Sequence, residues 1–429
     1  MDCRDPISDA RAPSAGVIKF TPMLTRARAL PRTATLVAGV TRRASAAIAE
    51  ALNGSAAPAA LPPDWRVEAF KPAPEPPAVR TDWRREEVAE IYRLPFTELL
   101  YRASTKHREH FDPLEVQRCT LLSIKTGGCT EDCKYCAQST RYNTGLKPEP
   151  MMSVNDVVDA AARAKAAGST RFCMGTAWRE MGKKKNAFGK ILSMVEQVNG
   201  MGLEVCCTLG MVNPEQAKQL KEAGLTAYNH NLDTSREHYP NVITTRTYDD
   251  RLQTIKNVRD AGISVCCGGI LGLGESEDDR IGLLWELATM EKHPESVPVN
   301  ALVPIEGTPM METGGAPDVF QMARTIATAR VIMPRSMVRL SAGRMSFGPL
   351  EQAVMFLAGA NSIFTGDKLL TTANPAFDED AQLFDSLGLK GKKAFASPYI
   401  EDKPWPAEKE KDAGVEAPAM PTSGVRVAE

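Results

Sequence analysis

Eight short runs rich in apolar and β-branched residues recur along the middle of the chain, separated by amphipathic patterns of helical period. The predicted strands cover residues 120–126, 170–176, 203–210, 227–233, 264–270, 296–303, 337–343 and 362–366. The helices between them have boundary signals: capping boxes at Ser153 with Asp156 and Ser276 with Asp279, and helix-ending glycines at Gly168, Gly224 and Gly262. Eight uninterrupted repeats predict an α/β protein with a parallel (β/α)8 barrel of the TIM type, in which ligand chemistry lies at the C-terminal ends of the strands.

Two segments of different composition border this barrel, for which we predict residues 84–395 and a flanking N-terminal helix. Residues 1–83 form a leader rich in Arg, Ala and Pro, in which residues 10–63 contain six Arg but a single acidic residue, Glu50. Such a segment cannot pack a core, so we expect disorder there and in the charged, Pro-rich tail 396–429. The stretch from Met23 has the composition of an organelle transit peptide, which predicts a mitochondrial protein that starts at Met1 or Met23. If the leader is instead a disordered extension of bacterial type, we expect a cytoplasmic protein.

The charge balance narrows the class of ligand. Lys and Arg total 52 against 53 Asp and Glu, and the net charge of -1 gives no general attraction for nucleic acid or anionic lipid. The apolar runs are short and interrupted by charges, so the sequence predicts a soluble protein without a membrane span. A small polar or acidic molecule is the expected ligand.

The strands show a polar parity. Alternate residues of a barrel strand point inward, and one parity collects Arg171, Cys173, Gly175, Glu204, Cys206, Thr208, Asn229, Asn231, Asp233, Ser264, Cys266, Gly268, Ser296, Pro298, Asn300, Met337, Arg339 and Ser341. The other parity is mostly apolar and suits packing under the helices. Because branched apolar side chains fill an ordinary TIM-barrel interior, this polar interior predicts a binding cavity.

Directly after the first predicted strand comes the segment SIKTGGCTEDCKYCAQSTRY, with Cys129, Cys133 and Cys136 at positions i, i+4 and i+7. Three thiolates on one Gly-rich turn suit a cubane iron–sulfur cluster and leave one of its irons open. Two alternatives are a redox pair, because Cys133 and Cys136 have CxxC spacing, and half of a zinc site. A zinc ribbon needs a second close pair downstream, and a redox motif leaves the third cysteine unused, so we favour the cluster.

Cys173, Cys206, Cys266 and Arg339 form a second group on the inward parity of different strands. Isolated strand cysteines are commonly small buried hydrophobic residues, which is the alternative to a second, smaller cluster deep in the barrel. The same parity places Cys207 and Cys267 under the helices, where we expect them to be inert.

A third group consists of Asn229, Asn231, Asp233 and Asn300. At strand ends, these amides and this carboxylate can bind ribose hydroxyls or a urea-like substrate through paired hydrogen bonds. Turn or capping roles are the alternative, above all for Asp233, which precedes Thr234 and Ser235.

These motifs resemble a known family. The CxxxCxxC loop before a barrel resembles the radical S-adenosylmethionine (SAM) enzymes. The motifs RFCMGTAW, EVCCTLGM, YNHNLDT, ITTRTYDDRL, VCCGGILGLGE, ESVPVN and VRLSAGR, in order from about Glu87 to Leu389, resemble the biotin synthases within that superfamily.

The resemblance implies a sulfurtransferase that converts dethiobiotin to biotin. By this resemblance Cys129, Cys133 and Cys136 hold a [4Fe-4S] cluster that cleaves SAM to a 5'-deoxyadenosyl radical, which abstracts hydrogen from dethiobiotin. A [2Fe-2S] cluster donates the sulfur, on the implied ligands Cys173, Cys206, Cys266 and Arg339. The implied SAM-binding residues are Tyr135, Asn231, Asp233, Arg251 and Ile270, and the implied dethiobiotin-binding residues are Asn231 and Asn300. The same resemblance implies a homodimer, a flavodoxin- or ferredoxin-type electron donor and the iron–sulfur assembly machinery as partners.

Two other functions stay open at this point. A different radical SAM enzyme, such as a hydrogenase maturase, would keep the first cluster but lack the set of Asn231, Asn300 and Arg339. A non-catalytic iron–sulfur or zinc carrier would use its cysteines for storage alone.

Overall fold

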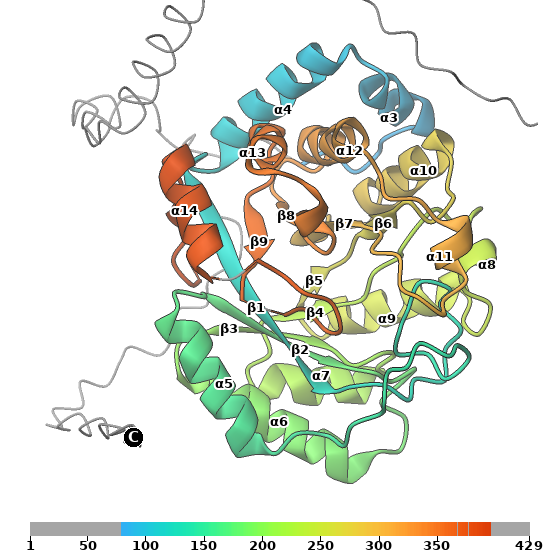
Figure 1. Cartoon of the computed structure of the whole chain (residues 1–429), viewed down its shortest axis with the longest axis vertical. Coiled ribbons are helices and arrows are strands. Elements are labelled where there is room, and N and C mark those ends of the chain that lie inside the picture. The colour runs from blue at the N-terminus through green and yellow to red at the C-terminus, as the bar shows by residue number, and fades with distance from the viewer. Residues whose placement is uncertain (1–78, 367, 376, 396–429) are drawn as a thin grey trace, which may run out of the picture. The chain divides into compact units, whose positions relative to one another are not determined.

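The computed structural model describes residues 79–366, 368–375 and 377–395, and its centre is a closed ring of parallel strands (Figure 1). The strands are β1 (Glu115–Lys125), β2 (Arg171–Thr176), β3 (Glu204–Thr208), β4 (Ala227–Asn229), β5 (Ser264–Cys266), β6 (Gly269–Leu271), β7 (Ser296–Ala301), β8 (Met337–Leu340) and β9 (Ser362–Phe364). Each strand pairs with its neighbour in the ring. The ring is closed because β1 pairs with both β2 and β9. The predicted eight-stranded parallel barrel is therefore confirmed.

One predicted strand, 264–270, is divided into β5 and β6, which together take one position of the barrel. Both pair with β7, Cys266 opposite Ser296 and Gly269 opposite Val299. Between these pairs lies Pro298, which has no N–H to donate to the ladder. Only glycine fits at position 268, at this interruption, because a Cβ there would lie 2.0 Å from the Pro298 carbonyl oxygen.

Helices surround the ring, and the predicted flanking N-terminal helix is in fact two helices, α3 (Arg85–Tyr92) and α4 (Phe96–His110). Pro95 lies between them, where proline favours a break. The remaining helices are α5 (Val154–Ala166), α6 (Lys185–Gly200), α7 (Pro214–Glu222), α8 (Tyr239–Val242), α9 (Tyr248–Asp260), α10 (Glu277–Ala288), α11 (Met310–Thr313), α12 (Val319–Ile332), η1 (Arg344–Ser346), α13 (Pro349–Leu357) and α14 (Phe377–Leu387). In Figure 1, α3 and α4 lie outside α10 and α12, against which they pack.

The predicted boundary signals are present. Ser153 accepts a hydrogen bond from the Asp156 amide at the start of α5, and Ser276 forms a capping box with Asp279 at the start of α10. A short strand not predicted from the sequence, β10 (Lys390–Gly391), pairs with the first residues of β1.

The predicted leader and tail fall mostly or wholly outside the described residues. Of residues 1–83 the structure describes 79–83, where Trp83 packs against the core and its carbonyl oxygen accepts a hydrogen bond from Trp285. The tail 396–429 lies outside. In the part of the chain that the structure describes, no helix combines the length and the apolarity that crossing a membrane requires.

Two separate cores flank the strands. The larger core lies between the ring and its helices and includes Cys207 and Cys267, whereas Cys119, Cys173 and Cys206 pack together inside the ring. The interior thus holds Cys173 and Cys206, as the parity argument predicted, and also Cys119, which it did not name.

An ion pair lies inside the N-terminal end of the ring. The guanidinium of Arg171 is 2.7 Å from the Glu204 carboxylate, and both side chains are 3% exposed. Glu204 also accepts hydrogen bonds from the Gln117 side chain and the Phe395 amide. A charge buried this deeply costs several kcal/mol if it loses its partner.

We expect Glu204→Gln to lower the free energy of unfolding by about 3 kcal/mol, because it leaves the Arg171 charge buried and unpaired. Urea unfolding followed by circular dichroism measures the change. The matched control is Asp260→Asn in the exposed pair with Lys256, which we expect to cost less than about 0.5 kcal/mol. Equal effects of the two substitutions would contradict the proposed role of the buried pair.

Candidate active site

A cavity of about 330 Å³ opens at the C-terminal ends of the strands. Every site residue predicted above lines this cavity except Cys266, which lies deeper, with its sulfur 3.3 Å from the Asn229 amide nitrogen. The cavity therefore brings the first cysteine loop, the Asn and Asp group and the interior thiols into one space. Its size and its mixture of apolar walls with a few polar groups are typical of a small-molecule site.

The cysteine loop follows β1 and begins with a turn that glycine makes possible. Gly127 and Gly128 both adopt left-handed backbone conformations, with φ of 68° and 74°. The loop then pairs with itself: the Cys129 amide donates to the Gln138 carbonyl oxygen, and the Thr140 amide donates to the Cys129 carbonyl oxygen. This closed turn presents all three thiols to the cavity.

Burial raises the pKa of each of these thiols, to about 11 for Cys136, which leaves them protonated unless a cation binds. Among the described residues, no three His, Cys, Asp or Glu side chains converge as ligands of a single metal ion. Each ligand of a cubane binds a different iron, so this donor set and its soft thiolates fit an iron–sulfur cluster.

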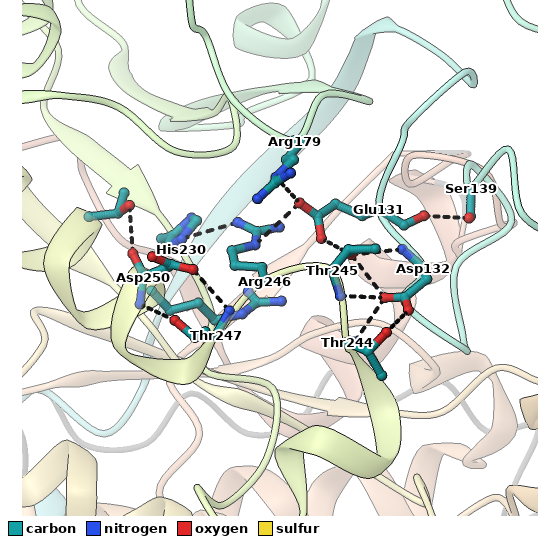
Figure 2. Close-up of polar contacts among 12 residues, drawn as sticks. Glu131, Asp132, Ser139, Arg179, His230, Thr244, Thr245, Arg246, Thr247 and Asp250 are labelled. Atoms are coloured by element: carbon teal, nitrogen blue, oxygen red, sulfur yellow. Dashed lines mark hydrogen bonds and ion pairs between the residues drawn. The ribbon is translucent and has the colours of Figure 1, made fainter.

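Asp132 ties the cysteine loop to residues 244–245, as Figure 2 shows. Its carboxylate accepts hydrogen bonds from the backbone amides and the hydroxyls of both Thr244 and Thr245. In return, the Asp132 amide donates to the Thr245 hydroxyl at 3.1 Å. Burial acts to raise the pKa of Asp132, but the hydrogen bonds from Thr244 and Thr245 outweigh it and lower the pKa to about 2.

The neighbouring Glu131 faces two arginines (Figure 2). Its buried carboxylate lies 3.2 Å from Arg179 Nε and 3.6 Å from Arg246 Nε. Arg246 in turn lies 3.4 Å from the His230 ring nitrogen. Burial, with Arg246 and Arg251 nearby, lowers the pKa of His230 well below its usual range, so the imidazole is neutral.

Asp233 is the centre of a polar group beside the cysteine loop. Its carboxylate accepts a hydrogen bond of 2.9 Å from the Tyr135 hydroxyl and pairs with Arg251 at 2.7 Å. Asp233 is also a non-glycine residue with a left-handed backbone, at φ 69°, and its amide and carbonyl bond to Gly268 and Ile270. Strain of this kind is held where the surrounding structure fixes it, often at functional sites.

The two asparagines predicted to face a substrate are held by the backbone. Asn231 Oδ1 accepts a hydrogen bond from the Gly268 amide, and Asn300 donates to the Gly269 carbonyl oxygen while accepting from the Ala342 amide. Both side chains line the cavity in fixed orientations. Such preorganised amides suit recognition of a polar ring.

The interior thiols differ in acidity. A hydrogen bond with Cys206 lowers the pKa of Cys266, burial opposes it, and the charge of Arg339 helps to leave the pKa at about 6. The pKa of Cys206 is raised to about 12: the hydrogen bond with Cys173 lowers it, but the bond with Cys266 and burial prevail. Cys266 is therefore the first of these thiols to ionise.

Arg339 is buried among thiols and neutral acceptors. Its nitrogens donate to Ser362 Oγ at 3.0 Å, to Gln117 Oε1 and Cys119 Sγ at 3.4 Å, and to Cys266 Sγ at 3.5 Å. Of the residues that the structure describes, none places an Asp or Glu oxygen within ion-pair distance of this guanidinium. A buried cation surrounded by thiols fits an anionic group held between them.

Four residues of the site were not predicted individually from the sequence: Cys119, Glu131, Asp132 and Arg246. The first predicted strand began at residue 120, whereas β1 begins at Glu115, so the inward position of Cys119 was lost. Extending the predicted strand back to Glu115 would have included it. The other three belong to quoted motifs, but their contacts join segments more than 100 residues apart, and no local signal predicts them.

Comparison with known proteins places two family models on the chain. The radical SAM superfamily model matches residues 123–284, and the Biotin and Thiamin Synthesis associated domain matches residues 298–390. Over 317 residues the chain is 61% identical to a biotin synthase of Cytophaga hutchinsonii, which covers 74% of this chain and 94% of that protein. Over 310 residues it is 60% identical to the mitochondrial biotin synthase of Arabidopsis thaliana, with coverage of 72% and 82%. For the mitochondrial biotin synthase of Saccharomyces cerevisiae the identity is 57% over 318 residues, with coverage of 73% and 85%.

Solved structures with little sequence similarity share the fold. Methylornithine synthase superposes with a TM-score of 0.61 at 16% identity and covers 72% of this chain and 94% of its own. HydG, a maturase of the [FeFe]-hydrogenase, superposes with a TM-score of 0.63 at 16% identity, with coverage of 73% and 72%. At this identity the likeness shows the barrel alone.

The low pKa of Asp132 generates a pH prediction. Because its pKa in the folded chain is depressed to about 2, the carboxylate stabilises the fold above about pH 4, and this contribution is lost as the pH falls from about 4 to about 2. After screening by solvent, the expected loss is no more than about 1 kcal/mol. Urea unfolding of the cluster-free chain at pH 5 and pH 3 measures it. In Asp132→Asn this part of the pH dependence should be absent, and an unchanged pH dependence would contradict the assignment.

Proposed function

Because this chain belongs to the biotin synthase family of radical SAM enzymes, we propose that the cavity described above inserts sulfur into dethiobiotin at two neighbouring iron–sulfur sites. The chain is a sulfurtransferase that uses SAM and iron–sulfur chemistry. The observation that carries the proposal is that one cavity is lined by two sets of thiols, three on the loop after β1 and two inside the barrel, Cys173 and Cys206. Cys266 lies just below the inner pair, with its sulfur 3.5 Å from Arg339. One set would hold the cluster that serves SAM cleavage, and the other would hold the cluster that supplies the sulfur.

We assign Cys129, Cys133 and Cys136 as the ligands of a [4Fe-4S] cluster. Three protein thiolates would leave one iron of such a cluster without a protein ligand and open to SAM. On the chain's side, Tyr135 and Arg251 fix the carboxylate of Asp233, which suits it to accept hydrogen bonds from ribose hydroxyls. Asn231 and Ile270 complete the proposed SAM-binding set. The hydrogen bonds of Asp132 keep the loop in register with this pocket.

Cys173, Cys206, Cys266 and Arg339 are the proposed ligands of a [2Fe-2S] cluster. The position of Arg339 supports this assignment, because one of its terminal nitrogens lies 3.5 Å from Cys266 Sγ. As an iron ligand, Arg339 would bind through a nitrogen that has given up its proton. When bound, the first cluster supplies the electron that cleaves SAM and the second supplies sulfur.

The remaining side chains position dethiobiotin between the two sites. Asn231 and Asn300, which the backbone holds in place, are the proposed partners of its ureido ring. The cavity walls, among them Leu302 and Ile305, exclude water and stray hydrogen donors from a reactive carbon.

The proposed partners follow from this chemistry. SAM cleavage requires an electron donor, for which a flavodoxin or a ferredoxin is suited, and the clusters require the iron–sulfur assembly machinery. We also propose a homodimer. Because several relatives are mitochondrial biotin synthases, we propose a mitochondrial location with the leader as targeting segment.

Two variants separate the sites. We expect Cys133→Ala to abolish SAM cleavage, because it removes a ligand of the first cluster, and Arg339→Ala to leave SAM cleavage intact. The measurement is 5'-deoxyadenosine formation after anaerobic reconstitution with iron and sulfide and reduction, with biotin from dethiobiotin assayed in parallel in the unmodified chain. A carrier would cleave no SAM, and a maturase would form no biotin.

Neighbouring cysteines of β3 provide a matched test of the second site. We expect Cys206→Ala to lose the [2Fe-2S] absorption and Cys207→Ala to keep both clusters, because Cys206 faces the interior and Cys207 packs under the helices. Visible absorption and iron content per chain measure this. Loss of the [2Fe-2S] absorption in Cys207→Ala would contradict the ligand assignment.

A further inference from the structure

A fourth thiol lies inside the barrel beside the proposed second cluster. Cys119 is on β1 and is fully buried, with 0% of its surface exposed. It does not join the large core under the helices, which holds Cys207 and Cys267, but packs with Cys173, Cys206 and Ala227 in the interior. Cys119 therefore contacts the thiol set itself.

Cys119 also contacts the one proposed ligand that is not a thiol. Arg339 donates a hydrogen bond from a terminal nitrogen to Cys119 Sγ at 3.4 Å, and the Cys119 thiol donates to Gln117 Oε1 at 3.6 Å. The other terminal nitrogen of Arg339 faces Cys266 Sγ at 3.5 Å. The guanidinium thus lies between two sulfurs, those of Cys119 and Cys266.

The pairing of β1 with β2 places the Cys119 sulfur on the N-terminal side of the thiol set. Cys119 pairs with Arg171, whereas Leu121 pairs with Cys173, so Cys119 lies one inward step nearer the N-terminal end of the barrel than Cys173. Below it, Arg171 already has its counter-charge in Glu204. In these contacts, Arg339 is the one charged group that the Cys119 sulfur meets.

We propose that Cys119 is an additional iron donor of the second cluster, which binds the iron assigned to Arg339 when the guanidinium does not. This inference rests on the proposed second cluster. A thiol binds iron as the thiolate, releasing its proton to solvent during assembly, and thiolates are the preferred donors of iron–sulfur clusters. The chain therefore offers that site four thiols and one guanidinium for four ligand positions.

The experiment compares the reconstituted unmodified chain with three reconstituted variants. They are Arg339→Ala, the double variant Arg339→Ala with Cys119→Ser, and the matched control Arg339→Ala with Cys207→Ser, which removes a buried thiol from the outer core instead. After anaerobic loading with ⁵⁷Fe and sulfide, Mössbauer and resonance Raman spectra report the amount and the ligands of the [2Fe-2S] cluster. Arg339→Met, which keeps more of the side-chain volume, replaces Arg339→Ala if circular dichroism shows that the latter is unfolded.

We expect Arg339→Ala and its Cys207→Ser control to hold a [2Fe-2S] cluster with an all-thiolate spectrum. The double variant with Cys119→Ser should bind that cluster at least about tenfold more weakly. Equal [2Fe-2S] content in the two double variants, or no cluster in Arg339→Ala, would overturn the role of Cys119. Absence of a [2Fe-2S] signal in the unmodified chain would instead refute the proposed second cluster, and the inference with it.

Discussion

The ladder between β9 and β1 is the contact on which both sites depend, because it turns a row of parallel strands into a closed ring. Closure brings the C-terminal ends of all strands to one rim of the barrel. There the cysteine loop after β1 contacts Asp233, which follows β4. It also positions Arg339: Ser362 pairs with Gln117 in this ladder, and the side chains of both accept hydrogen bonds from the guanidinium. An open sheet would leave that guanidinium in water.

A polar interior weakens the barrel as a structure and makes it useful as a site. Apolar side chains fill most barrel interiors, and each buried polar group here needs a partner. Near the N-terminal end the charge of Arg171 is balanced within the chain by Glu204, which also accepts a hydrogen bond from Gln117. Nearer the cavity, Arg339 donates to thiols and neutral acceptors, and no carboxylate among the described residues balances its charge. The unbalanced charge marks where the fold leaves room for an anionic group.

Periodicity in the sequence was enough to predict the strand order, the parallel barrel and the inward direction of Cys173, Cys206 and Arg339, because these depend on local pattern. Three features could not be predicted in that way. The split of β5 from β6 arises from Pro298 on the neighbouring strand. The left-handed backbone of Asp233 is imposed by its contacts with the strand beside it. The bond network of Asp132 joins distant parts of the chain and exists only after folding.

One ten-residue segment, 243–252, connects the cysteine loop with Asp233, because its successive residues contact different parts of the site. Thr244 and Thr245 hold Asp132 of the cysteine loop, and Arg246 lies between Glu131 and His230. Thr247 then caps α9, whose first turns bring Arg251 to Asp233. Because the capped helix fixes the spacing between these contacts, the cysteine loop and the Asp233 pocket cannot shift independently. In the proposed SAM site this rigid connection keeps the reacting bond aligned with the cysteine loop while Asp233 holds the ribose.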